Sequence, residues 1–341
     1  MKKIEEIPQK AQAVVLKSYN EDQADVEVQE VEVPLPKDGE VLVKMIASPI
    51  NPSDLMFTKG LYGVKKELPV VPGFEGCGIV VAAGGGFTSK FLLGKRVACG
   101  ATETGGGTWA NYMLTGSDYC MPLKKFVADH EAAMMIVNPM TAWGMVDEAL
   151  AGRHKAIVQT AAASALGKMV IRLGKRFSIP VINVVRREEQ VKLLQEKEQA
   201  EYVVNSSRDD FDEALSELCH KLHATIALEA VSGELSAQIA AAMPRKSELL
   251  VYGALSREAV NIHPGDLIFQ EKTVRGFWLS KWLKEKSLLQ KISIAGKVQK
   301  LLSSDLSTHI QQKSPLDDIQ NALKTYEDNM TAGKVLLQCS P

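Results

Sequence analysis

Tyr62 is the residue whose type and setting first suggest chemistry. It lies in the segment Ile50–Gly76, within the run Gly60-Leu61-Tyr62-Gly63, so a glycine stands close to it on either side. With an unperturbed pKa near 10, a tyrosine hydroxyl stays protonated at neutral pH. A donor about 3 Å from a carbonyl oxygen stabilises negative charge that develops there. We predict that Tyr62 is such a donor; the alternative is a loop tyrosine whose hydroxyl lies in water.

A second candidate site is the run Thr160-Ala161-Ala162-Ala163-Ser164-Ala165-Leu166-Gly167. Aligned on Gly167, it matches a G-x-G-x-x-G turn with Ala162 and Ser164 in the first two glycine positions. Such a turn brings backbone N–H groups to a pyrophosphate at a helix N-terminus. The motif is weak alone, but it follows a predicted strand and opens a predicted helix. The predicted cofactor contacts are Ala162, Ser164, Ala165, Leu166 and Gly167.

The next predicted strand ends in Asn183-Val184-Val185-Arg186-Arg187. An NAD site usually carries an acidic residue about 20 residues after the turn, where it binds the ribose hydroxyls. Two guanidinium groups instead suit a 2′-phosphate, which arginine holds bidentately. Arg186 and Arg187 therefore predict NADPH as the cofactor. The alternative is a solvated loop that happens to be basic.

The middle of the chain, between His154 and Leu255, predicts the elements that position this turn. Strands and helices alternate there, which predicts a doubly wound parallel sheet. The predicted strands are 155–160, 179–185, 202–205, 225–231 and 249–253. The predicted helices are 166–177, 188–199, 209–222 and 234–243.

The first third of the chain is rich in short apolar or alternating runs bounded by proline and glycine, which predicts strands and barrel-like turns. After the alternating region we expect a strand at 273–279, helices at 281–302 and 317–326, and a strand at 334–338. These elements are expected to return to the first domain. We therefore predict an α/β protein with a β-rich domain (1–126), a Rossmann domain (127–268) and a returning segment (269–341).

The overall composition excludes several function classes. A net charge of −1 argues against nucleic-acid binding, and no apolar run reaches the length of a membrane span. The amino terminus resembles neither a secretory signal nor a transit peptide, so we expect a cytoplasmic protein. The five cysteines contain no Cys-x-x-Cys pair, which favours reduced thiols. Cys219-His220 with His223 is better explained as an exposed helix end than as a metal site.

Several motifs together resemble the zinc-free branch of the medium-chain dehydrogenase/reductase superfamily, and within it the mitochondrial-type 2-enoyl thioester reductases. The resemblance covers nearly the whole chain. Its most specific pieces are Ile50-Asn51-Pro52-Ser53-Asp54, Tyr62-Gly63 with Glu67-Leu68-Pro69, Gly107-Thr108-Trp109, Asn138-Pro139-Met140-Thr141-Ala142, Asn183-Val184-Val185-Arg186 and Arg275-Gly276-Phe277-Trp278-Leu279-Ser280-Lys281-Trp282.

The resemblance explains why no metal is expected. Where zinc-dependent relatives carry Cys, this chain has Asn51-Pro52-Ser53-Asp54, and where they carry Gly-His-Glu it has Gly73-Phe74-Glu75. It also implies a GroES-like catalytic domain joined to a Rossmann domain, usually in a homodimer. The implied reaction is NADPH-dependent reduction of the 2,3 double bond of an enoyl thioester, with Tyr62 as the catalytic tyrosine.

Further site residues are expected from the chemistry that this reaction needs, with core packing as the alternative for the tryptophans. Asn51 and Thr141 are expected to hydrogen-bond the nicotinamide side or Tyr62. The expected apolar acyl pocket consists of Trp109, Phe277, Trp278 and Trp282. Lysines near both segments are expected to form a basic rim for coenzyme A or an acyl carrier protein, namely Lys65, Lys66, Lys281, Lys284 and Lys286.

Two other functions stay open at this point. An NADPH:quinone oxidoreductase shares the fold and the cofactor but needs no placed acid. A non-enzymatic NADPH-binding protein is the alternative from another class. The sequence does not decide acyl chain length, carrier protein versus coenzyme A, or oligomer size.

Overall fold

The computed structural model describes residues 1–340, which form two compact units. Unit 1 combines Met1–Asn138 with Ala295–Pro341, and unit 2 is Pro139–Ile294. Both unit boundaries lie later in the chain than the predicted boundaries at residues 126 and 268. No helix among residues 1–340 is both long and apolar enough to cross a membrane.

Unit 1 is built around an eight-stranded sheet with the path β15-β16-β4-β5-β6-β8, to which β1 and β7 are attached. The strands of this sheet are β1 (Lys2–Lys3), β4 (Glu40–Pro49), β5 (Glu75–Ala83), β6 (Arg96–Gly100), β7 (Tyr112–Gly116), β8 (Cys120–Pro122), β15 (Ile310–Pro315) and β16 (Lys334–Gln338). A separate two-stranded sheet is formed by β2 (Lys10–Ser18) and β3 (Asp25–Glu32). Its helices are α1 (Pro52–Thr58), α2 (Phe87–Leu92), α3 (Asp129–Ala133) and α12 (Ile319–Asp328).

The carboxyl-terminal strand β16 pairs with β4 just before the Ile50–Gly76 segment begins. It runs antiparallel to β4, with Leu337 opposite Ser48 and Leu336 opposite Pro49. The end of the chain therefore packs beside the start of the segment that carries Tyr62. Sequence predicted this return to the first domain.

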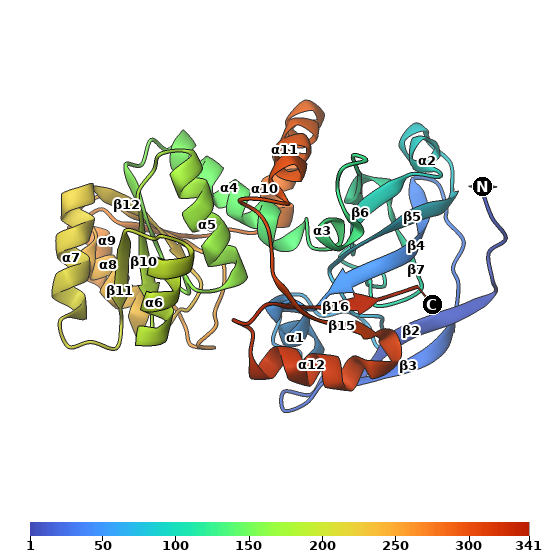
Figure 1. Ribbon diagram of the computed structural model, residues 1–341, viewed down its shortest axis with the longest axis horizontal. Coiled ribbons are helices and arrows are strands. Elements are labelled where there is room, and N and C mark those ends of the chain that lie inside the picture. The colour runs from blue at the N-terminus through green and yellow to red at the C-terminus, as the bar shows by residue number, and fades with distance from the viewer. Residues whose placement is uncertain (341) are drawn as a thin grey trace. The chain divides into compact units, whose positions relative to one another are not determined.

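Unit 2 is a doubly wound parallel sheet, and Figure 1 shows helices on both sides of it. The strand order is β11-β10-β9-β12-β13-β14, and every pair is parallel. The strands are β9 (Ala156–Gln159), β10 (Val181–Val185), β11 (Tyr202–Asn205), β12 (Ala224–Glu229), β13 (Glu248–Val251) and β14 (Thr273–Gly276). The helices are α4 (Val137–Ala151), α5 (Ala165–Arg176), α6 (Glu188–Lys197), α7 (Phe211–Leu222), α8 (Glu234–Ala242), α9 (Pro264–Ile268), α10 (Leu279–Lys284) and α11 (Leu288–Leu301). Of these, α4 begins in unit 1 and α11 ends in unit 1. The predicted α/β fold class is confirmed.

The prediction for β14 was wrong in its partner. The strand was expected to return to the first domain, but it pairs in parallel with β13, with Gly276 opposite Val251. It therefore completes the six-stranded sheet of unit 2. A short strand carries no local signal for which sheet it joins, because sheet partners are chosen by long-range pairing.

The single helix predicted at 281–302 is in fact two helices, α10 and α11. The break contains a Ser-x-x-Gln capping box, in which Ser287 and Gln290 bond each other's backbone N–H groups at 3.3 and 2.8 Å. Such a box satisfies N–H groups at a helix start, so a new helix begins there.

Candidate active site

The segment that carries Tyr62 begins with helix α1, and Tyr62 follows the end of that helix. The backbone N–H groups of Leu61 and Tyr62 both donate to the Met56 carbonyl, at 2.8 and 3.1 Å. Gly60 lies in the left-handed region (φ +72°), and a Cβ there would lie 2.9 Å from the Tyr19 Cβ. Glycine is therefore required at this turn, which fixes where the chain leaves α1.

The ring of Tyr62 is half-buried and packs on Phe74, near the other end of the same segment. The two ring centroids are 4.9 Å apart with an interplanar angle of 42°, within the range of favourable aromatic pairs. Phe74 in turn contacts Phe57 of α1, edge to face at 5.6 Å. Packing thus gives the Tyr62 ring a defined position, and its catalytic role stays a prediction.

A buried polar network includes residues from both ends of the Ile50–Gly76 segment. Asn51 is fully buried; its Nδ2 donates to Glu75 Oε1 at 3.0 Å, and its Oδ1 accepts from the Lys334 ammonium at 2.5 Å. Lys334 also donates to the Ile50 carbonyl (3.2 Å) and the Tyr326 hydroxyl (2.9 Å). The prediction that Asn51 hydrogen-bonds the nicotinamide or Tyr62 is therefore not supported, because its amide is committed inside unit 1.

Two buried carboxyl groups belong to this network. Asp54 accepts from the backbone N–H of Asn51 (2.8 Å) and of Phe74 (2.9 Å), and Glu75 accepts from the N–H groups of Ile136 (2.8 Å) and Val137 (2.9 Å). Burial raises the pKa of Asp54 to about 7 and also raises the pKa of Glu75. Backbone hydrogen bonds and the Lys334 charge offset part of this desolvation for both groups.

The residues of this network differ in how visible they are from the sequence. Asp54 and Glu75 lie within the motifs compared with zinc-dependent relatives, but their residue types alone do not predict a role. Lys334 is 283 positions from Asn51, and a lone lysine in a strand has no pattern that marks it as buried. Only the pairing of β16 with β4 brings it to the site.

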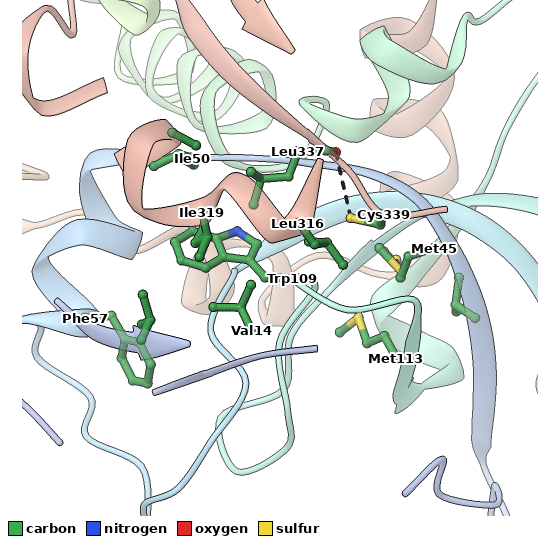
Figure 2. Close-up of a cluster of buried hydrophobic side chains, with 14 of the residues drawn as sticks. Val14, Met45, Ile50, Phe57, Trp109, Met113, Leu316, Ile319, Leu337 and Cys339 are labelled. Atoms are coloured by element: carbon green, nitrogen blue, oxygen red, sulfur yellow. Dashed lines mark hydrogen bonds between the residues drawn. The ribbon is translucent and has the colours of Figure 1, made fainter. Parts of the chain in front are cut away.

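Trp109 does not line a pocket, contrary to the prediction. Its side chain is fully buried in the core of unit 1, and its Nε1 donates to the Pro49 carbonyl at 3.3 Å. Figure 2 shows it among apolar side chains that include Val14, Ile50 and Ile319. A large aromatic residue in a β-rich domain stabilises the core by burying its ring, and that is what Trp109 does.

Lys66 is likewise not available for the predicted basic rim. Its ammonium donates to the carbonyls of Thr102 (2.8 Å) and Gly105 (2.6 Å), and burial lowers its pKa to about 8. Its backbone N–H donates to the Tyr19 hydroxyl at 2.8 Å. Lys66 therefore links the loop after Tyr62 to the loop at residues 102–105 by hydrogen bonds, while the neighbouring Lys65 is exposed.

In unit 2, the predicted phosphate turn lies between β9 and α5. Ser164 caps α5, its Oγ accepting from the Gly167 N–H at 3.0 Å. A Cβ at Gly167 would lie 2.4 Å from the Ala162 carbonyl oxygen, so only glycine allows this close approach. Ala165 and Leu166 begin the helix, where N–H groups have no intrahelical acceptor. This turn therefore fits an anionic group such as a pyrophosphate.

Arg186 and Arg187 follow β10, the strand next to β9 in the sheet. The pairs Asn183–Gln159 and Ile182–Val158 align the two strands, so both end at the same sheet edge. Both arginine side chains are exposed, and neither takes part in an ion pair within residues 1–340. Two unpaired guanidinium groups at this edge fit the 2′-phosphate of NADPH.

The remaining predicted pocket residues lie in unit 2, around α4 and α10. Phe277 and Trp282 are buried, and a Cβ at Gly144 of α4 would lie 2.9 and 3.2 Å from their rings. They pack against each other and against α4. Trp278 is 44% exposed and Thr141 is half-buried, so these two retain accessible surface.

Within residues 1–340, no group of three or more His, Cys, Asp or Glu side chains is arranged to hold a metal ion. All five cysteines are free and buried. Cys219 is buried on α7, and His223 ends that helix in the left-handed conformation.

Comparisons with known proteins agree with this architecture. Residues 37–125 match the alcohol dehydrogenase GroES-like domain, and residues 165–293 match the zinc-binding dehydrogenase domain. A mitochondrial enoyl-[acyl-carrier-protein] reductase of Caenorhabditis elegans is 33% identical over 252 residues, covering 72% of this chain and 71% of the relative. The human enzyme of the same name is 29% identical over 335 residues, covering 97% and 89%.

A solved structure extends the match to the whole fold. A candidate NADPH:quinone reductase of Mesorhizobium loti is 34% identical, with a TM-score of 0.90 over 98% of this chain and 100% of that one. The chain therefore belongs to the medium-chain dehydrogenase/reductase superfamily, in the group of the mitochondrial enoyl-[acyl-carrier-protein] reductases and their quinone reductase-like neighbours.

Proposed function

We propose that this protein is an NADPH-dependent reductase of the 2,3 double bond of an enoyl thioester. The observation that carries the proposal is the fixed seat of Tyr62, between the end of α1 and the Phe74 ring. Relatives named enoyl-[acyl-carrier-protein] reductases, which align over most of the chain, supply the reaction class.

NADPH would be held by unit 2. The N–H groups at the start of α5 would bind the pyrophosphate, with Ser164 and Gly167 keeping the turn tight. Arg186 and Arg187 would bind the 2′-phosphate. The chemistry that this cofactor supplies when bound is hydride donation.

Tyr62 would provide the acid side of the reaction. Reduction at the β-carbon moves negative charge to the thioester oxygen, and a phenol O–H near that oxygen would stabilise it by a hydrogen bond. The ring packing on Phe74 restricts the positions that the hydroxyl can take, so less ordering is needed when substrate binds. Trp278, with its exposed ring, is the predicted aromatic residue best able to contact the acyl group.

The second candidate is an NADPH:quinone reductase, which the Mesorhizobium loti relative favours. Quinone reduction needs no acid held at one fixed point, so substituting Tyr62 separates the two activities. In Tyr62→Phe, kcat with crotonyl or hexenoyl thioesters should fall about 100-fold, in the range of an oxyanion-type donor. Quinone turnover and the NADPH dissociation constant should stay within about twofold of wild type.

The outcomes of this assay are distinct. Quinone turnover without any enoyl thioester turnover would replace the leading proposal by the second. NADPH binding with no turnover on enoyl thioesters, enones or quinones would favour a non-enzymatic NADPH-binding protein. Comparing carrier-protein and coenzyme A thioesters of graded length would define the acyl carrier and the chain length.

We further propose that the protein is a homodimer formed through strand β14. Within residues 1–340 this edge strand pairs with β13 alone, and all four of its residues are exposed. Exposed apolar side chains lie just before it, at Leu267, Ile268 and Phe269. An unpaired edge beside apolar surface is a pairing site for a second copy. Light scattering should give a dimer for wild type and a monomer for Val274→Lys.

The cellular location is also a proposal. We propose a cytoplasmic location, whereas the relatives named above are mitochondrial by name. Fractionation of cells that express the natural gene would decide between these locations.

A further inference from the structure

The two ends of the segment that carries Tyr62 are joined by one buried side chain. Asp54 is fully buried, and its two carboxylate oxygens have different partners. Oδ2 accepts from the N–H of Asn51, where α1 begins, at 2.8 Å. Oδ1 accepts from the N–H of Phe74, twenty positions further along the chain, at 2.9 Å.

Two of the contacts that position Tyr62 lead back to these two partners. The Tyr62 N–H is bonded to Met56 in α1, the helix whose start is held by Asp54. The Tyr62 ring packs on the Phe74 ring, and the Phe74 backbone is held by the other oxygen of Asp54. Asp54 therefore fixes the distance between the helix that carries the Tyr62 backbone and the ring that supports its side chain.

A buried carboxylate is costly, so its retention needs an account. The groups that face Asp54 are the carboxyl group of Glu75 on β5, which opposes its ionisation, and the ammonium of Lys334 on β16, which favours it. Neither makes a direct hydrogen bond to Asp54, whose two hydrogen-bond donors are both backbone N–H groups of the Ile50–Gly76 segment. Its position thus serves the geometry of that segment.

We propose that Asp54 is the positioning residue for Tyr62, acting through its bonds to Asn51 and Phe74. This inference rests on the proposed function only in assigning Tyr62 the acid role. Asp54 contacts neither substrate nor cofactor in this scheme. It acts by fixing the distance between the Phe74 ring and the end of α1, which together hold Tyr62 in position.

The first test is Asp54→Asn, which retains one acceptor oxygen but turns an NH₂ group toward the other backbone N–H. The kcat for enoyl thioesters should fall about 10- to 100-fold, the range expected when a reacting group is misplaced. The NADPH dissociation constant should not change. In a Tyr62→Phe background the same substitution should change kcat less than about twofold, because its effect passes through the hydroxyl.

A second variant, Phe74→Leu, tests the ring contact without altering the buried carboxyl group. It should lower kcat in the same direction as Asp54→Asn. The matched control is Thr115→Val, which removes another buried side-chain hydrogen bond of unit 1, from Thr115 Oγ1 to the Gly100 carbonyl at 2.9 Å. Thr115→Val should lose an amount of stability similar to that lost by the two test variants, while its kcat stays near the wild-type value.

Hydrogen exchange separates this inference from the proposed function. The amides of Leu61 and Tyr62 should exchange faster in Asp54→Asn than in wild type, while the Thr115→Val protein keeps wild-type exchange there. If wild type turns over no enoyl thioester, the proposed function fails and this exchange difference still tests Asp54. Unchanged exchange in Asp54→Asn, or additive losses of kcat in the double variant, would overturn the positioning role.

Discussion

The substitution Gly167→Ala measures how tightly the phosphate turn is built. An added Cβ would lie 2.4 Å from the Ala162 carbonyl oxygen and 2.7 Å from its carbonyl carbon and Cα. All three are backbone atoms, so the turn itself must move to make room. The displaced residue, Ala162, is one of the predicted cofactor contacts, and NADPH affinity should therefore fall together with stability.

The expected magnitude comes from two opposing effects. Overpacking at a site that cannot yield costs about 1–3 kcal/mol. Replacing glycine by alanine in a helix gains up to about 1 kcal/mol. The two ranges together leave a net loss between about 0 and 3 kcal/mol. A loss in the middle of that range, about 1–2 kcal/mol, corresponds to a melting temperature about 2–8 °C lower for a unit of this size. Displacement of the turn should also raise the NADPH dissociation constant at least about tenfold, which is 1.4 kcal/mol.

Gly296→Ala is the matched control, because the same chemical change should have the opposite sign. Gly296 lies inside α11, and a Cβ there would meet nothing within 4 Å. Alanine should stabilise the protein by about 0.5–1 kcal/mol and leave NADPH affinity unchanged.

Differential scanning calorimetry and NADPH fluorescence titration measure both quantities on the same samples. Equal stability changes in the two variants, or wild-type NADPH affinity in Gly167→Ala, would refute the reasoning from the close approach of Ala162.

The remaining predictions concern charges. Burial raises the pKa of Asp54 to about 7, against 3.8 for the free group, with Glu75 and Lys334 facing it. As pH falls below about 7, kcat should fall because the ionised form of Asp54 is lost. Over the same range the contribution of Asp54 to the free energy of unfolding should rise, because the native carboxyl group binds a proton that the unfolded one does not. Stopped-flow rates and urea unfolding check these opposite trends between pH 5.5 and 8, roughly the window around that pKa. Both trends should be absent in Asp54→Asn. Lys334→Met should cost about 3–5 kcal/mol in urea unfolding, since Asp54 and Glu75 lose the ammonium that favours their ionisation, and adding Glu75→Gln should restore part of it. Arg186→Ala should weaken NADPH binding about 10- to 100-fold, because a charge-assisted hydrogen bond is worth about 1.5–3 kcal/mol, and should have little effect on NADH binding. Equal losses for both cofactors would contradict this role. Arg187→Ala tests the second guanidinium group in the same way.

Local patterns predicted much of unit 2. Strands β11 and β16 were predicted at their observed bounds, and the helices of the alternating region were predicted within a few residues. Helix α5 begins at the predicted turn, with Ser164 as its cap, and the exposed arginines directly follow β10 as predicted. These features depend on neighbours along the chain, through hydrophobic periodicity and turn geometry, so sequence carries them directly.

The aromatic residues mark the limit of such patterns. Of the four that were predicted to line an acyl pocket, Trp109 is fully buried in the core of unit 1, and Phe277 and Trp282 are packed on α4. Trp278 alone has a large exposed surface. A tryptophan is equally suited to a core and to a pocket, so its type does not reveal which surface it meets.

The sequence by itself determined the two-domain α/β class, the phosphate turn and the candidate tyrosine, because each is written in residues close together in the chain. Tertiary structure decided what surrounds Tyr62. The pairing of β16 with β4 delivers Lys334 to Asn51, and Asp54 closes the loop onto Phe74. Likewise β14 joined the sheet of unit 2 through pairing with β13. Such contacts are selected by the free energy of long-range packing and buried hydrogen bonds, which no local pattern of residues records.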